Sequence, residues 1–213
     1  MNKYITVSER SSAEIIKKRS RFIATVVPVK TENEAVLFLN EIKKKYSDAR
    51  HNVYAYSLRE NNAARYSDDG EPSQTAGLPI MDMIKKMGIT DLLVVVTRYF
   101  GGILLGTGGL VHAYTKAAKE GIILAKPVEM VLCREIFIRC DYTLFGKIKS
   151  CISELRYTYS EPEYSDMVKI CVFVPEEETD KFRAAIKDLS FGKAVCEPGG
   201  IKYSRSDKNV LLT

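Results

Sequence analysis

Several features are scarce in this sequence, and each scarcity excludes a class of protein. No apolar run approaches the roughly 20 residues that a membrane helix needs, so we expect no membrane-spanning segment. The first ten residues, MNKYITVSER, contain no apolar signal core. We therefore expect a cytoplasmic protein that does not bind a membrane.

Metal-binding and catalytic patterns are also missing. The five cysteines form no C-x-x-C pair, and the two histidines form no H-E-x-x-H motif. A serine nucleophile would need G-x-S-x-G, and Ser73 lies in E-P-S-Q-T instead. The sequence thus predicts no metal site and no cofactor, and it identifies no catalytic residue. We expect buried free thiols in a reducing compartment, at Cys133, Cys140, Cys151, Cys171 and Cys196.

The chain of 213 residues is long enough for two small domains, and its positive charge is concentrated in the first part. Residues 1–128 contain 19 Lys and Arg residues against 13 Asp and Glu residues, a formal charge of +6. Residues 129–213 carry a formal charge of −1, from 13 basic and 14 acidic residues. The charge of the first part permits binding to a polyanion without requiring it.

The chain is organised around residues 92–118, LLVVVTRYFGGILLGTGGLVHAYTKAA. Five consecutive apolar residues at 92–96 predict a strand buried on both faces. Five glycines then indicate backbone that bends sharply or lets another segment approach closely. Apolar residues at helical spacing predict a helix from about Leu110. The glycines are Gly101, Gly102, Gly106, Gly108 and Gly109.

The end of this strand is a candidate anion site. Arg98, Tyr99 and Phe100 are expected to be exposed beside the glycine loop, where free N–H groups at a helix start attract anions. Known nucleotide loops do not match, because Thr107 stands where a P-loop has Lys, and G-x-G-x-x-G is broken. The alternative interpretation is a tight turn that packs a helix on a sheet.

Basic and imidazole side chains upstream extend this candidate site. Lys18, Arg19 and Arg21 lie at a bend between two expected strands, where they either blunt a sheet edge or contact phosphate. His51 stands at the start of another expected strand, as a structural hydrogen-bonding group or as part of the site.

An acidic turn follows at residues 68–71. Asp68, Asp69 and Glu71 lie among turn-forming residues and could hold a hard cation such as Mg²⁺. They could equally cap helices or pair with Arg65, Arg98 or the N-terminal basic cluster. We favour the second interpretation, because no phosphate-transfer motif accompanies them. Thr75 is expected to cap the helix that follows.

Beyond residue 128 the pattern changes. Expected elements are a strand at 131–140, a helix at 144–155, strands at 157–161 and 168–174, a helix at 176–189 and a strand at 194–203. This β-α-β-β-α-β order is the ferredoxin-like split motif. We expect an α+β protein with domains at 1–128 and 129–205 and a tail at 206–213.

The sequence resembles the YigZ/IMPACT family. The resemblance rests on TRYFGGILLGTGGLVHAY, DDGEPSQTAGLPI, KKRSRFIA and ARHNVYAY, which occur in the family's order. Gln74 and His112 depart from the family's usual Gly and Arg. The resemblance implies an N-terminal α/β two-layer sandwich similar to domain four of elongation factor G, and a C-terminal domain similar to domain five.

Two functions follow as hypotheses. The resemblance implies translation regulation through binding of RNA or the ribosome, and the charge of the first part agrees with it. The alternative is an enzyme that acts on a small phosphorylated ligand, with a metal at the acidic turn. The sequence does not identify a protein partner.

Overall fold

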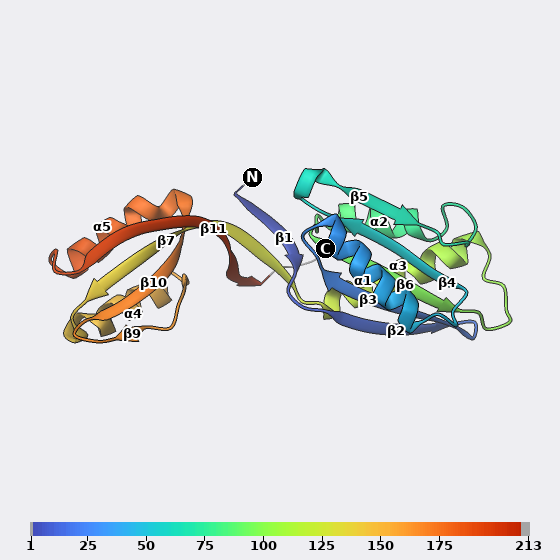
Figure 1. Ribbon diagram of the computed structural model, residues 1–213, viewed down its shortest axis with the longest axis horizontal. Helices are drawn as coiled ribbons and strands as arrows, with labels where there is room; N and C mark the ends of the chain where they lie inside the picture. Colours follow the sequence, from blue (N-terminus) through green and yellow to red (C-terminus); the bar gives the residue numbers. More distant parts are fainter. Residues whose placement is uncertain (1, 210–213) are drawn as a thin grey trace. The chain divides into compact units, whose positions relative to one another are not determined.

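The computed structural model describes residues 2–209, which form two compact units (Figure 1). The N-terminal unit comprises Tyr4–Val128. The C-terminal unit comprises Glu129–Asn209 together with residues 2 and 3. Among the described residues, no helix is both long and apolar enough to cross a membrane. All five cysteines are free thiols, three of them buried.

The N-terminal unit is built on a five-stranded antiparallel sheet with the order β2-β3-β6-β4-β5. These strands are β2 (Ser11–Lys17), β3 (Ser20–Pro28), β6 (Leu92–Tyr99), β4 (His51–Ser57) and β5 (Ala64–Ser67). The central strand β6 is buried from Leu92 to Arg98, as its apolar run predicts. A further strand, β1 (Lys3–Val7), makes a parallel bridge between Ile5 and Ile89.

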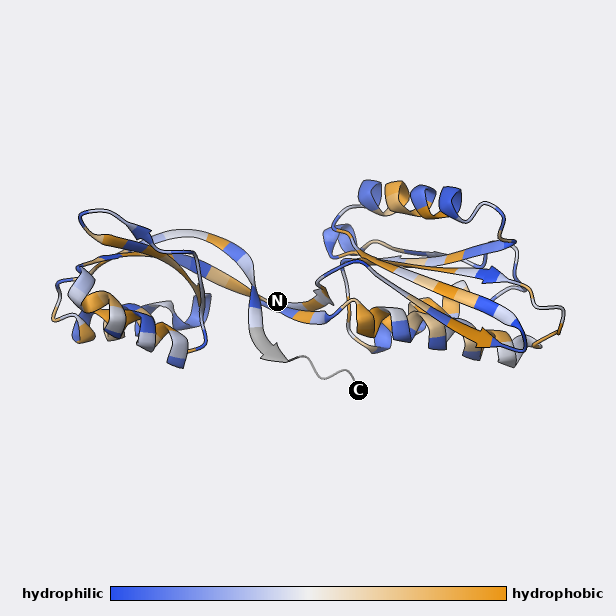
Figure 2. Cartoon of the chain, turned by 90° about the horizontal axis from the view of Figure 1, so that it is seen from below, coloured by the Kyte–Doolittle hydropathy of each residue, from blue (hydrophilic) through white to orange (hydrophobic). Residues whose placement is uncertain are grey.

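Helices cover both faces of this sheet (Figure 2). On one face lies α1 (Glu32–Lys45), whose Ala35, Leu39 and Ile42 are buried. On the other lie α2 (Gly77–Lys86) and α3 (Thr107–Leu124). The α+β class is confirmed, and α1 adds a layer that the expected two-layer sandwich did not contain. A short 3-10 helix, η1 (Glu60–Asn62), connects β4 to β5.

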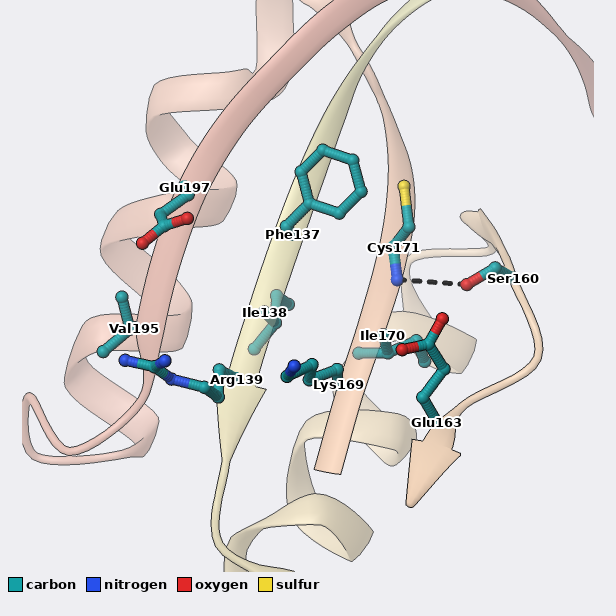
Figure 3. A pocket seen from close by; sticks show the side chains of 10 residues that line it. All are labelled: Phe137, Ile138, Arg139, Ser160, Glu163, Lys169, Ile170, Cys171, Val195 and Glu197. Carbon is teal, nitrogen blue, oxygen red and sulfur yellow. Dashed lines mark hydrogen bonds between the residues drawn. The ribbon is translucent and has the colours of Figure 1, made fainter. Parts of the chain in front are cut away.

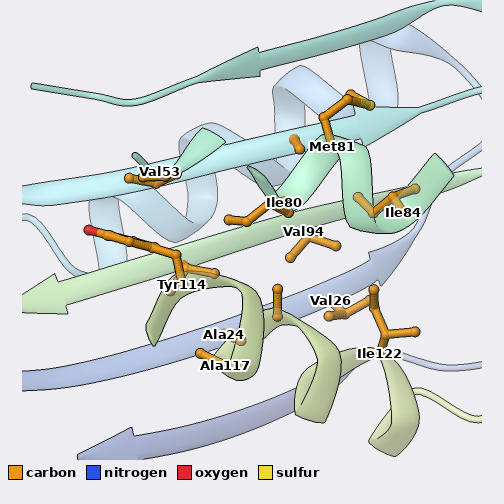
Figure 4. Packing of buried hydrophobic residues seen from close by; sticks show 14 of the residues in the cluster. Ala24, Val26, Val53, Ile80, Met81, Ile84, Val94, Tyr114, Ala117 and Ile122 are labelled. Carbon is orange, nitrogen blue, oxygen red and sulfur yellow. The ribbon is translucent and has the colours of Figure 1, made fainter. Parts of the chain in front are cut away.

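The larger core lies between the sheet and the helices α2 and α3 (Figure 4). Val26 and Val94 of the sheet pack there with Ile80 and Ile84 of α2 and with Ile122 of α3. Gly121 lets α3 approach β3, because a Cβ at this position would lie 3.0 Å from Val26 Cγ2. The core therefore fixes where α3 begins relative to the end of β6.

The C-terminal unit has the split β-α-β-β-α-β arrangement. Its main elements are β7 (Pro127–Cys140), α4 (Tyr142–Glu154), β8 (Thr158–Tyr159), β10 (Val168–Pro175), α5 (Thr179–Leu189) and β11 (Val195–Asn209). Minor elements are β9 (Glu163–Tyr164) and η2 (Glu176–Glu178). The strand order β8-β10-β7-β11 follows from the pairing, with β9 also on β10. Ile148, Ile152, Phe182 and Ile186 of the helices pack on one face of the sheet.

The last strand is longer than the sequence indicates. β11 continues to Asn209, whereas a strand ending at residue 203 was expected. Residues 206–209 of the expected tail therefore belong to β11, and residues 210–213 lie outside the described residues.

Candidate functional site

The candidate residues of the N-terminal unit gather at one end of its sheet. Arg98, near the end of β6, lies directly opposite Phe22 of β3 and His51 of β4. Arg21 lies opposite Tyr99 in the same register. Antiparallel pairing thus brings together segments that are far apart in the sequence.

Arg98 is buried, so the expectation of an exposed guanidinium is wrong. The residue is 6% exposed, and its Nη1 donates to Glu71 Oε1 at 2.7 Å and Oε2 at 3.0 Å. The guanidinium also lies 5.5 Å from the ring centroids of Phe22 and Phe100. Glu71 neutralises the cation inside the fold, which is what makes its burial tolerable. Arg98 Nε has no hydrogen-bond partner among the described residues.

Tyr114 of α3 is a third member of the buried cluster that Arg98 and Glu71 form. Its hydroxyl donates to Glu71 Oε1 at 2.7 Å, the same oxygen that accepts from Arg98. Burial, together with the hydrogen bond to Glu71, raises the pKa of Tyr114, so the phenol stays a donor. Helical spacing with Leu110 predicts only that Tyr114 lies on the apolar face of its helix. The missed signal was a phenol within a stripe of small apolar residues, since a buried tyrosine hydroxyl needs a partner.

His51 lies at the edge of the same cluster. Its Nε2 is 3.9 Å from Glu71 Oε1, and its Nδ1 is 2.8 Å from the carbonyl oxygen of Asp69. Gly70 has a φ of +87°, and a Cβ there would lie 3.4 Å from His51 Nδ1. The acidic turn thus passes directly over the imidazole, which serves as a structural contact here.

The carboxylates of the acidic turn are held by donors of the protein. Asp68 accepts the N–H groups of Ala76 and Gly77 at the start of α2, and also that of Gln74. Asp69 accepts from Lys43 Nζ at 3.0 Å and from the N–H of Asn52 at 2.6 Å. These contacts support the interpretation of capping and ion pairing. The described residues contain no cluster of three His, Cys, Asp or Glu side chains that could hold a metal.

The expected cap of α2 was assigned to the wrong residue. The hydroxyl of Thr75 donates to the carbonyl of Pro72 at 2.7 Å, so Asp68 satisfies the helix start instead. Gln74 has a φ of +62°, in the left-handed region that favours glycine. This backbone conformation explains physically why glycine would suit the position.

Tyr99 points to the opposite face of the sheet from Arg98, because successive residues of a strand alternate. Its hydroxyl donates to Asp48 Oδ1 at 2.7 Å, and this bond raises the pKa of Tyr99. Arg21 lies over the Tyr99 ring at 5.5 Å and makes two hydrogen bonds to Glu14. Arg98 and Tyr99 therefore cannot meet one small ligand together.

The turn between β2 and β3 lies against the glycine loop. Lys18 and Arg19 form the turn with φ values of 45° and 64°. Gly101 donates its N–H to Ser20 Oγ at 3.1 Å, and a Cβ at Gly101 would lie 2.1 Å from the carbonyl carbon of Arg19. Lys18 Nζ also reaches the carbonyl of Leu104 at 3.4 Å. We call residues 17–19 and 100–106 together the hairpin–loop surface.

This surface is basic and apolar at once. Lys17, Lys18 and Arg19 are exposed, and in the described part of the chain none of them forms an ion pair. Phe100, Ile103 and Leu104 are exposed as well, Leu104 by 81%.

The start of α3 borders the hairpin–loop surface. The helix begins at Thr107 rather than near Leu110, and its N-cap is Gly106 with a φ of 73°. No side chain caps this end. Thr107 and Gly108 are exposed, and Gly109 is half-buried, beside Leu105. Gly102, with a φ of +83°, has open space around it. The glycines thus serve backbone geometry first, at the positions where the loop turns.

Comparisons with known proteins agree with this architecture. Residues 18–122 match the family described as Impact N-terminal domain, and residues 138–193 match a domain of unknown function (DUF1949). A solved structure titled "Crystal structure of an hypothetical protein" has a TM-score of 0.59 and 27% identity. The aligned region covers 92% of this chain and 97% of the solved structure's chain. The fold and the site define a two-unit α+β protein with an Impact-type N-terminal unit.

Curated relatives extend the match over the chain. The IMPACT family member YvyE of Bacillus subtilis is 41% identical over 204 residues, which are 95% of this chain and 94% of the relative. The IMPACT family member YigZ of Escherichia coli is 30% identical, over 82% of this chain and 87% of the relative. A protein IMPACT homolog of Dictyostelium discoideum matches 46% of this chain at 39% identity. The chain belongs to the IMPACT family, which confirms the resemblance seen in the sequence.

Proposed function

We propose that this protein binds RNA or the ribosome through the hairpin–loop surface and acts in translation regulation. Family membership supports a role related to translation regulation in general, and the site supports the mode of binding. The observation that carries the proposal is the position of Lys17, Lys18 and Arg19. These cations have no ion-pair partner among the described residues and are held beside an exposed aromatic ring.

The chemistry of this surface suits a phosphate backbone with unpaired bases. Lysine and arginine neutralise phosphates and release counterions, which gives affinity that falls as salt rises. Phe100 is 43% exposed and offers a ring on which a base can stack. Gly101 ties the loop to the hairpin turn, so the ring and the cations keep a fixed spacing.

Arg98 acts behind this surface as a positioning residue. It is bonded to Glu71, and its guanidinium lies 5.5 Å from the Phe100 ring centroid. We infer that the buried Arg98–Glu71 pair packs against the inner side of the Phe100 ring and does not itself contact phosphate. The described contacts do not favour the enzyme hypothesis, because all three carboxylates of the acidic turn accept hydrogen bonds from the protein.

The test is ribosome pelleting and RNA gel shift across a salt series, with the full chain. The double variant Lys18→Ala, Arg19→Ala should bind severalfold more weakly and with a shallower salt dependence, by about 0.7 per lost contact to an unpaired strand. The matched control is Lys85→Ala, Lys86→Ala, in the last turn of α2. Equal binding by the two double variants, or no salt-sensitive binding by the unaltered protein, would refute the proposal.

A further inference from the structure

The C-terminal unit has a sheet face that none of its described helices covers. The helices α4 and α5 pack on one face, and the opposite face of β7, β10 and β11 is open (Figure 2). A hollow of about 370 Å³ lies on this open face (Figure 3). Its volume falls within the range of small-molecule sites, roughly 300–1,000 Å³.

Phe137 is the aromatic side chain of this hollow that is available for contact. It lies on β7, directly opposite Cys171 of β10, and is 48% exposed. A Cβ at Gly199 of β11 would lie 2.6 Å from the Phe137 ring. The ring therefore occupies space that is free only because residue 199 has no side chain. Phe173 lies on the same face, but Lys202 Nζ already covers its ring at 4.5 Å. Phe137 alone of these two rings remains open for stacking.

Two cations stand side by side next to Phe137. Arg139 of β7 and Lys169 of β10 are directly opposite each other in the register, and both are exposed. Like charges in this relationship repel. In the part of the chain that the structure describes, neither cation forms an ion pair. An anion between them would relieve the repulsion.

The spacing of the ring and the cations matches one chemical unit. Phe137 and Arg139 are two residues apart on one strand, so they share a face at a separation of about 6.6–6.8 Å. A flat aromatic group and a nearby anion on one ligand describe a nucleotide. Aromatic rings on the open sheet of a four-stranded β-α-β-β-α-β unit are a known way to stack unpaired bases.

We propose that this hollow binds a nucleotide of an unpaired RNA strand. The base stacks on Phe137, and its phosphate lies between Arg139 and Lys169. Glu163 of β9 lies directly opposite Lys169 in the register, and Glu197 also borders the hollow, so these carboxylates leave room for one phosphate only. The footprint is therefore short, with one phosphate neutralised, unlike a groove that follows a long backbone. This site is separate from the hairpin–loop surface and goes beyond the function proposed above.

The first test removes the stacking ring. A labelled RNA tetranucleotide is titrated against the full chain carrying Lys18→Ala and Arg19→Ala, so that the hairpin–loop surface does not contribute. Adding Phe137→Leu should weaken binding about fivefold or more, the equivalent of losing one stacked base. The matched control is Phe191→Leu, the same change at a residue that is 88% exposed and outside the hollow. Equal affinities for the two variants would overturn the proposal.

The second test removes the cations and does not depend on the fold around Phe137. The slope of log affinity against log salt should be near −0.7, the value for one phosphate of a single strand. Arg139→Gln with Lys169→Gln should bring it close to zero. The control, Arg183→Gln with Lys187→Gln on α5, removes the same charges and should leave the slope unchanged. Equal slopes of log affinity against log salt for the two double variants would contradict the site.

Two further arms separate the alternatives. A nucleoside monophosphate that binds as tightly as the tetranucleotide would support the nucleotide site and assign it to a free nucleotide, whereas weaker binding of the monophosphate would assign it to a strand. Ribosome pelleting tests the hairpin–loop surface independently. Loss of tetranucleotide binding on adding Phe137→Leu, with unchanged ribosome pelleting by the chain that carries Phe137→Leu alone, supports this site.

Discussion

Arg98 and Tyr114 donate to the same carboxylate oxygen, Oε1 of Glu71, each at 2.7 Å. One donor comes from the central strand, the other from α3, and the acceptor comes from the acidic turn. The three side chains are buried together. Removing one partner of a buried ion pair leaves an uncompensated charge, which is more costly than losing an exposed pair.

Glu71→Ala is expected to lower the free energy of unfolding by about 3–5 kcal/mol, because Arg98 would remain buried without its anion. Urea denaturation monitored by circular dichroism measures this loss. The control is Glu14→Ala, which removes an exposed partner of Arg21 and should cost at most about 1 kcal/mol. Similar losses for the two variants would show that Arg98 reaches solvent or another partner.

Tyr114→Phe should lower stability at neutral pH by about 1–3 kcal/mol, since Glu71 loses a buried donor. The pKa of Tyr114 is raised in the folded state, so its contribution is complete below the ordinary tyrosine value of 10.0 and is lost as pH rises above it. Above pH 10 the stability of Tyr114→Phe should therefore fall less steeply than that of the unaltered protein, by about 1.4 kcal/mol per pH unit.

The control for this titration is Tyr66→Phe, because Tyr66 is an exposed residue on β5. Its stability should follow that of the unaltered protein at every pH. Identical slopes above pH 10 for Tyr114→Phe and Tyr66→Phe would mean that Tyr114 ionises in the folded protein.

Gly101→Ala should damage both stability and binding through the hairpin–loop surface. A methyl group at this position would lie 2.1 Å from the carbonyl carbon of Arg19, so the turn and the loop must separate. Gly108→Ala is the matched change in the first turn of α3, where nothing lies within 4 Å. Thermal melts should show a large decrease for Gly101→Ala and none for Gly108→Ala, and the reverse order would disprove the close packing.

Gln74→Gly should stabilise the protein by up to about 1 kcal/mol. The left-handed backbone at φ +62° costs about 1–2 kcal/mol for a residue with a Cβ, and part of the gain is offset by the greater freedom of glycine in the unfolded chain. Gln74→Ala keeps the strain and should give no gain. Stabilisation by both changes in a denaturant titration would point to the glutamine side chain instead.

Local patterns predicted the fold well where neighbours in sequence decide it. The apolar run of β6 predicted a strand buried on both faces, and it is one. Thr31 and Glu34, three residues apart, have the spacing of a capping box that begins a helix, and the Thr31 hydroxyl accepts the Glu34 N–H at 3.2 Å. Glu34 reaches back to the N–H of Lys30 rather than to Thr31, which still closes the helix start.

The errors concern long-range partners. Arg98 looked exposed because a strand end with an arginine commonly reaches solvent, and its anion lies 27 positions upstream. Strand β5 was missed because its four residues merge into the turn, and pairing with β4 defines it. The role of Tyr114 likewise depends on Glu71, which no spacing rule connects to it. The site residues and the RNA or ribosome partner stay predictions.

The contact between Gly101 and the β2–β3 turn has an evolutionary consequence. Two segments some 80 positions apart share a joint without room for an added atom, so neither can change length alone. Relatives that insert residues into either segment should carry a compensating insertion in the other. Changes in the length of the β2–β3 turn and of the loop at Gly101 are therefore expected to occur together in the same relatives.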